Sequence, residues 1–163
     1  MSLLKILLYP HPLLQEVSAE VDPSEAGIKD LVEDLVQTMR DHGGVGIAAP
    51  QTGVLKRIII VDVGPEKNGH GLLRLLNPRI VFSSGKRKGR EGCLSVPEYR
   101  ANITRARKVR VEALTPQGEP FSLEAKGFEA VALQHEIDHL DGILFIDRVT
   151  DMRRDLFRRE PGV

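Results

Sequence analysis

Apolar side chains recur at every third or fourth position between residues 28 and 39, the spacing that places them on one face of an α-helix. Asp22 is a residue type that caps helix N-termini, and Pro23 suits the first helical position, so we expect the helix to begin there. Gly43 and Gly44 mark its end. The segment therefore predicts an amphipathic helix that packs one face on a core.

Four other runs follow the patterns of β-strands. Residues 57–63 are rich in β-branched side chains, which is typical of a buried strand. Residues 72–82 continue as a strand broken at an Asn-Pro pair that starts at residue 77. Residues 109–114 and 121–125 flank a turn and alternate in polarity, so they predict an antiparallel hairpin.

Two polar stretches predict loops. Residues 66–71 form a polar loop in which we expect His70 to be solvated, and residues 83–90 form a basic loop. Near the C-terminus, Thr150 and Asp151 can cap a final helix that runs to Arg159.

A second long helix is predicted over residues 128–140, which contain no proline and no glycine and are followed by Gly142. Its apolar residues fall on two sides, so we expect this helix to be buried. Helices mixed with antiparallel strands indicate an α+β fold. The length of 163 residues suits one domain, and we expect residues 1–163 to form a single catalytic domain.

Composition limits the classes of partner. Lys+Arg and Asp+Glu both number 23, so the net charge is zero, which argues against DNA or an anionic membrane as an obligate partner. The single cysteine excludes an internal disulfide framework and fits a reducing compartment. No apolar run has the length of a membrane span, and the N-terminus lacks the features of a secretory signal. We therefore expect a cytoplasmic protein.

The predicted buried helix carries the pattern His-Glu-x-x-His at residues 135–139. On a helix, His135 and His139 stand on one face, close enough to bind the same cation. Glu136 then lies beside a water on that cation, where it can act as a general base. The alternative is two core histidines, but without a metal they would leave costly unpaired polar groups.

A catalytic centre of this kind usually has a third protein ligand. Cys93 is the candidate, because it is the only cysteine and a thiolate binds such metals well. Taken alone, a single cysteine is more often a small buried apolar residue.

Residues 43–51 are rich in glycine and alanine, so this backbone can pass close to another group. A phosphate-binding loop is disfavoured because no Lys-Ser or Lys-Thr pair follows. Gln51 ends the stretch, either as a placed amide donor or as a surface residue.

In this order and spacing, residues 44–51, 91–95 and 135–140 resemble the three motifs of the peptide deformylase family. The resemblance implies antiparallel sheets packed around a central metal-binding helix. It also implies removal of the formyl group from formyl-methionine at the N-terminus of nascent polypeptides. One divalent ion per chain is expected, Fe²⁺ natively, with Zn²⁺, Ni²⁺ or Co²⁺ as substitutes.

The resemblance also implies roles for residues. Cys93, His135 and His139 would bind the metal. Metal-bound water would attack the formyl carbon, with Glu136 as general base and then general acid. The side-chain amide of Gln51 and the backbone N–H of Leu94 would stabilise the oxyanion. Independently of the resemblance, we expect Asp138 to face away from the metal, where it either supports the metal site or has a structural role, with an arginine such as Arg105 as its candidate partner.

The methionine side chain needs an apolar pocket. The candidates for the lining of this pocket lie in the glycine-rich loop and on the helix, one and two turns before His135. All of them are equally compatible with an ordinary core. The residues expected to bind substrate are Gly44, Gly46, Ile47, Phe128, Val131 and Ala132, with Arg100 on the peptide backbone.

Three features depart from the family pattern or leave partners open. Ile47 stands where the family often has Leu, and Gly89 and Arg90 stand where an apolar residue often helps form the mouth of the pocket. Four arginines in the last eleven residues suit either ribosome contact or an amphipathic surface helix. We expect a monomer.

Two rival functions remain. A zincin-like protease would take its third ligand after the helix, where Glu160 is the one candidate. A binding protein on an inactivated frame is disfavoured, because every motif residue is present.

Overall fold

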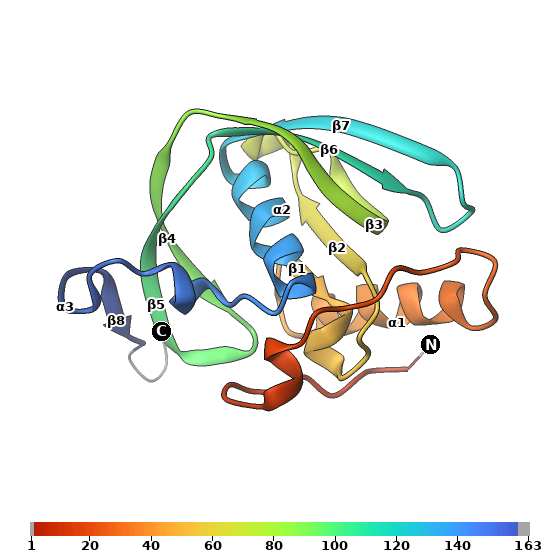
Figure 1. The fold of residues 1–163 in the computed structure, drawn as a ribbon, viewed down its shortest axis with the longest axis horizontal. Helices are drawn as coiled ribbons and strands as arrows, with labels where there is room; N and C mark the ends of the chain where they lie inside the picture. Colours follow the sequence, from red (N-terminus) through yellow and green to blue (C-terminus); the bar gives the residue numbers. More distant parts are fainter. Residues whose placement is uncertain (1, 160–163) are drawn as a thin grey trace.

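The computed structural model describes residues 2–159 and contains two antiparallel sheets with a long helix between them (Figure 1). The five-stranded sheet has the order β1-β2-β3-β6-β7, with strands Gly46–Ala48, Ile58–Val63, Gly71–Ser84, Lys108–Leu114 and Pro120–Lys126. The three-stranded sheet has the order β4-β5-β8, with strands Arg87–Cys93, Val96–Arg105 and Leu156–Arg158. The α-helices are α1 (Ile28–Asp41), α2 (Gly127–Leu140) and α3 (Met152–Asp155). Short 3₁₀ helices are η1 (Pro12–Gln15), η2 (Ala49–Thr52), η3 (Pro65–Lys67) and η4 (Phe145–Arg148).

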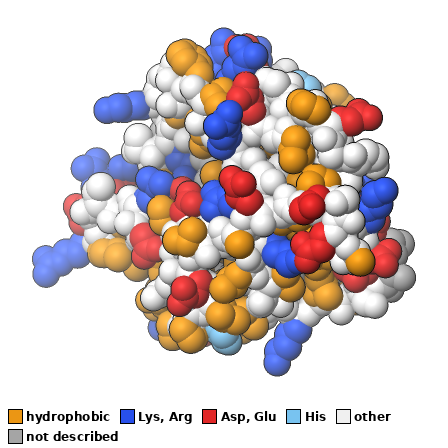
Figure 2. Space-filling model, turned by 45° about the vertical axis from the view of Figure 1, so that its right-hand side comes forward, with side chains coloured by type: hydrophobic (Ala, Val, Ile, Leu, Met, Phe, Trp, Pro, Cys, Tyr) orange, Lys and Arg blue, Asp and Glu red, His pale blue; other side chains and the backbone are white. Residues whose placement is uncertain are grey.

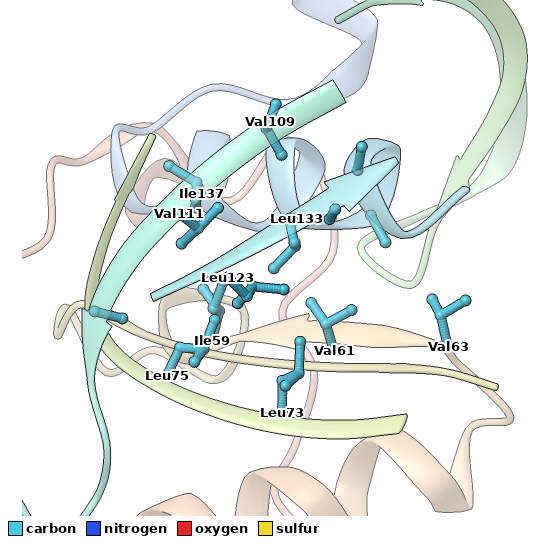
Figure 3. Packing of buried hydrophobic residues seen from close by; sticks show 14 of the residues in the cluster. Ile59, Val61, Val63, Leu73, Leu75, Val109, Val111, Leu123, Leu133 and Ile137 are labelled. Carbon is cyan, nitrogen blue, oxygen red and sulfur yellow. The ribbon is translucent and has the colours of Figure 1, made fainter. Parts of the chain in front are cut away.

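Helix α2 is buried on several sides, as the sequence predicts. Leu133 and Ile137 point into a cluster formed with strands of the five-stranded sheet, where Val111 and Leu123 lie opposite them (Figure 3). A second cluster joins the other face of that sheet to α1, and a third packs beneath the three-stranded sheet around Phe145. Because apolar burial is the main favourable term in folding, these contacts hold α2 in a fixed place between the sheets.

Helix α1 begins five residues later than the sequence suggests, at Ile28 and not at Pro23. Asp22 does not cap it; its Oδ1 accepts hydrogen bonds from the backbone N–H (2.9 Å) and hydroxyl (2.7 Å) of Ser24 and closes a turn. Aspartate competes with the helix in this way because its short side chain bonds its own backbone. Gly27, at φ 88°, then redirects the chain into the helix at Ile28.

The expected basic loop at residues 83–90 is wrong. Strand β3 runs to Ser84, and after a tight turn β4 starts at Arg87. The sequence does not indicate β4 because the outward side chains of this strand are mostly charged. Its partner, β5, is not indicated by the sequence either. The expected break in β3 is a β-bulge at Asn77, whose φ is 50°. The Asn77 side chain accepts a hydrogen bond from the backbone N–H of Val21 and donates one to the carbonyl of Val21.

The predicted C-terminal helix is also too long. Asp151 caps its start, accepting from the backbone N–H of Arg153 and of Arg154, but α3 ends at Asp155. Leu156 then pairs with Ala101, so the chain adds β8 to the edge of the three-stranded sheet. Arg159, where the helix is expected to end, lies outside any helix.

Lysine and arginine side chains alternate with aspartate and glutamate over the face shown in Figure 2, in keeping with the balanced charge. None of the helices in residues 2–159 is long and apolar enough to cross a membrane.

Candidate metal centre

Three potential ligand side chains meet where the end of β4 faces α2. Cys93, His135 and His139 offer ligand atoms that all lie within 4.8 Å of one another. Sγ of Cys93 is 3.3 Å from Nε2 of His139, and the two imidazole rings, one helical turn apart, have centroids 5.1 Å apart. A thiolate and two imidazoles form a donor set suited to Zn²⁺, Fe²⁺ and related divalent ions.

His135 is held by a carboxylate that the sequence did not single out. Its Nδ1 lies 2.8 Å from Oε1 of Glu91, which leaves Nε2 free to bind a cation. Arg105 donates two hydrogen bonds to Glu91, at 2.6 and 3.0 Å. Glu91 precedes Cys93 by two residues on β4. Because side chains alternate along a strand, both residues face the same side of the sheet.

The expected pairing of Asp138 with Arg105 is confirmed. Nη1 of Arg105 donates a hydrogen bond to Oδ2 of Asp138 at 2.9 Å. Arg148 donates one to each carboxylate oxygen of Asp138, at 2.5 and 2.7 Å. A chain of hydrogen bonds therefore runs from His135 through Glu91, Arg105 and Asp138 to Arg148, and the last four side chains alternate in charge. Breaking a buried pair leaves an uncompensated charge, so this network strongly favours one orientation of His135.

Glu136 is buried beside the ligand cluster. Its Oε1 has no hydrogen-bond partner among the described residues. Burial raises the pKa of Glu136 to about 7, although the charges of His135 and Arg105 oppose the shift. A carboxyl group with such a pKa can both accept and release a proton near neutral pH.

The donor atoms fit a bound cation. Nδ1 of His139 is the second buried atom at this centre without a hydrogen-bond partner in residues 2–159. Burial, and then the charges of His135 and Arg105, hold the pKa of His139 well below its usual value. The imidazole is thereby kept neutral, which is the form that binds metals. Nε2 of His139 faces Cys93, and the unpartnered oxygen of Glu136 lies beside the cluster, an arrangement that suits a metal ion and its water.

Gln51 is brought to the centre by η2. It is 1% exposed, so the surface alternative is wrong. Its Oε1 accepts from the backbone N–H of Ala48 at 2.9 Å, which turns its Nε2 towards Ser95 Oγ (3.1 Å) and Cys93 Sγ (3.5 Å). Ser95 was not predicted, and it fixes the direction of this amide. Leu94, in the β4–β5 turn, separates Cys93 from Ser95.

The glycine-rich segment lies against the centre at two points. A Cβ atom on Gly46 would lie 2.4 Å from Glu136 Oε2, and one on Gly44 would lie 3.1 Å from Leu94 Cδ1. Ile47, by contrast, is fully buried in the cluster beneath α1. Successive strand residues face opposite ways, so the Ile47 side chain points away from Glu136 and only its backbone faces the centre.

The other predicted substrate residues lie around the centre. Phe128, Val131 and Ala132 precede His135 by seven, four and three positions and therefore share its helix face. Phe128 and Val131 are partly buried, and Ala132 is 5% exposed. Arg100 on β5 passes over Gly92, where its Cγ would be 3.6 Å from an added Cβ atom. Glu160, the rival third ligand, lies outside the described residues.

Comparisons with known proteins agree with this geometry. A sequence model of the polypeptide deformylase family matches residues 3–155. The peptide deformylase of Thermodesulfovibrio yellowstonii is 41% identical over 160 residues, which are 98% of this chain and 97% of that protein.

Solved structures show the same fold. The peptide deformylase from Ehrlichia chaffeensis in complex with actinonin gives a TM-score of 0.88 at 40% identity, covering 94% of this chain and 92% of that chain. A Met-Ala-Ser-bound class I type b peptide deformylase from Acinetobacter baumannii gives 0.86 at 36% identity, covering 91% and 99%. The expected α+β architecture around a central helix is therefore confirmed, and the chain belongs to the peptide deformylase family.

Proposed function

We propose that this protein hydrolyses the N-terminal formyl group of formyl-methionyl nascent polypeptides and releases formate. The observation that carries the proposal is the Cys93-His135-His139 cluster beside Glu136, a buried carboxyl group with one unpartnered oxygen. The third donor comes from a strand that precedes the helix and lies 3.3 Å from His139, which favours a deformylase over a zincin-like protease.

Cys93, His135 and His139 would hold one divalent ion per chain, natively Fe²⁺, with Zn²⁺, Ni²⁺ or Co²⁺ as substitutes. Such an ion lowers the pKa of water and polarises a carbonyl oxygen. Imidazole and thiolate ligands suit all four metals.

Glu136 handles the protons. Water adds to the formyl carbon while Glu136 takes one of its protons. As the C–N bond breaks, Glu136 returns that proton to the amine nitrogen, so that formate and a free N-terminus leave. The raised pKa of Glu136, about 7, supports both directions of transfer.

Gln51 and Leu94 stabilise the charge that develops on the formyl oxygen. Ser95 and Ala48 fix the Gln51 amide, so its Nε2 is positioned before the substrate arrives. The backbone N–H of Leu94 lies next in sequence to Cys93. One such donor typically contributes about 10²- to 10³-fold to kcat.

The substrate peptide lies against β1 and α2. Gly44, Gly46 and the backbone of Ile47 let the peptide approach Glu136. Phe128, Val131 and Ala132 form the wall of the methionine pocket. Arg100, on the other side of the centre, contacts the peptide backbone.

We further propose that residues 1–163 act as a single catalytic domain and a monomer in the cytoplasm, where nascent chains are made. Arg153, Arg154 and Arg158, all exposed near the C-terminal end, support a contact with the ribosome, whose RNA is anionic. The net charge of zero argues against a specific DNA partner.

The test is formate release from formyl-Met-Ala-Ser, with acetyl-Met-Ala-Ser as the control substrate. The enzyme would be loaded with Ni²⁺ in air or with Fe²⁺ under anaerobic conditions, and metal content would be measured in the same sample. Release from the formyl peptide alone is the expected result. A fully metallated protein that releases no formate would refute the proposal.

A further inference from the structure

The loop between β2 and β3, residues 64–70, is attached to the first turn of α2 by a buried carboxylate. Glu129 is fully buried, and both of its oxygens bond His70: Oε2 accepts from the backbone N–H at 2.6 Å, and Oε1 lies 2.6 Å from Nδ1. The His70 side chain is 50% exposed, as expected for a solvated loop residue, but it also bonds this buried carboxylate. Burying a carboxylate is costly unless it is bonded, so this contact holds the loop firmly on the helix.

The same loop also holds the neighbouring residue of α2. Nζ of Lys67 lies 4.8 Å from the centroid of the Phe128 ring, a distance at which an ammonium group is attracted to an aromatic face. Lys67 and His70 therefore hold the consecutive helix residues Phe128 and Glu129. We call these two contacts the loop latch.

The start of α2 is also held by the bond from the Gly127 N–H to the Arg107 carbonyl (3.0 Å) and by Ala130 in the core, but it has few restraints on the side of this loop. Its N-cap residue, Lys126, makes no side-chain capping bond. A hollow of about 390 Å³ opens beside it, lined by Asn68, Arg87, Arg107, Lys126 and Gly127. Without the loop latch, the first turn would have open space on this side and could shift.

Phe128 marks the far end of the helix face that carries His135. It lies seven residues, about 10 Å, before His135 along the helix. A side chain that runs along this face from the metal centre meets Ala132 and Val131 first and Phe128 last. If this face lines the methionine pocket, as the proposed function requires, the position of the Phe128 ring sets how long a side chain fits.

We propose that the loop latch determines specificity for the first residue of the substrate by fixing Phe128 at the end of the methionine pocket. This inference rests on the proposed deformylase function and adds a selectivity mechanism to it. Lys67 and His70 are positioning residues, since they act through Phe128 and Glu129 and do not touch the substrate.

The test compares Lys67→Ala and His70→Ala with the parent enzyme, all loaded with Ni²⁺. Values of kcat and KM are measured for peptides that begin with formyl-Met, the shorter formyl-norvaline and the larger formyl-Phe. One methylene in an apolar pocket is typically worth about 10- to 200-fold in discrimination. We expect the preference for Met to fall at least threefold in each variant, through KM, with kcat for formyl-Met within twofold of the parent.

Two further variants separate positioning from general stability. His70→Asn places an amide near the position of Nδ1 and should restore the preference for Met. Lys56→Ala removes an exposed ion pair with Glu25 (2.7 Å) elsewhere on the surface and should leave the preference unchanged.

Unchanged selectivity in both alanine variants, with formyl-Met still hydrolysed, would refute the proposal that the loop latch determines specificity. An equal loss of selectivity in Lys56→Ala would also overturn it. If the parent enzyme released no formate from any peptide, the proposed function itself would fail, so the two failures are distinguishable.

Discussion

A Cβ atom on residue 46 would lie 2.4 Å from Oε2 of Glu136, closer than real Cβ contacts, so any other residue at this point of β1 would displace the buried carboxyl group. Gly46 is thus tied to Glu136 by contact and not by the conformation of its backbone. This relationship yields the first of five predictions.

Gly46→Ala should keep the fold and the metal but lower kcat about 10²-fold, because a shift of about 1 Å in a reacting group costs that much. Gly89→Ala is the matched control, since a Cβ atom there meets nothing within 4 Å. Formate release and metal content would be measured for both. Equal activity of the two variants would show that the Glu136 carboxylate need not occupy its observed position.

Glu136→Gln should retain the metal and lose at least about 10³-fold in kcat, since the proton acceptor is removed while all three ligands remain. Elemental analysis and formate release give the two readouts. A variant with full activity would refute the role of Glu136 in proton transfer.

Cys93→Ser should weaken metal retention, because an alcohol is a much poorer ligand than a thiolate. Metal content after dialysis against a chelator measures the effect. Normal occupancy in the variant would exclude Cys93 as a ligand.

Glu91→Gln should lower metal affinity about 10- to 100-fold, the usual effect of changing a group that orients a ligating histidine. Glu124→Gln is the control, because its 3.5 Å ion pair with Lys108 is exposed and such pairs contribute about 0–1 kcal/mol. Competition with a chromogenic chelator compares the variants. If affinity fell equally in both, the hydrogen bond from His135 to Glu91 would not be the cause.

The Fe²⁺-loaded enzyme should lose activity in air faster than the Ni²⁺-loaded enzyme, because both the iron and its thiolate ligand are open to oxidation. Activity against time in air, with an anaerobic sample alongside, measures this. Equal lifetimes would exclude oxidation at the centre as the cause of inactivation.

The sequence predicts the parts of the site that depend on local order. The His-Glu-x-x-His spacing lies within one uninterrupted helix, so the relation of His135 to His139 follows from helix geometry alone. The side-chain patterns also predict the buried strand β2 and the β6–β7 hairpin.

The three-stranded sheet was not predictable in the same way. Charged residues such as Arg87 and Lys88 mask β4, and β8 exists because Leu156 finds an open edge of β5, a long-range pairing that no local pattern encodes. The contacts of Glu91 and Ser95 do not follow from the sequence for the same reason, since they depend on how this sheet meets α2 and η2 respectively. The exposure of His70 follows from its polar loop, but its bond to the buried Glu129 does not, because Glu129 is 59 residues away in sequence.

The ligands come from both layers of the molecule: Cys93 closes β4 in the three-stranded sheet, while His135 and His139 belong to a helix packed on the five-stranded sheet. A cation bound by all three therefore acts as a crosslink between segments 42 residues apart in sequence, in a chain whose single cysteine cannot form an internal disulfide. Binding energy at such a crosslink is also folding energy. Loss of the metal would abolish the reaction and remove this crosslink, leaving the bonds of His135 to Glu91 and of Arg105 to Asp138 to hold α2 to the three-stranded sheet.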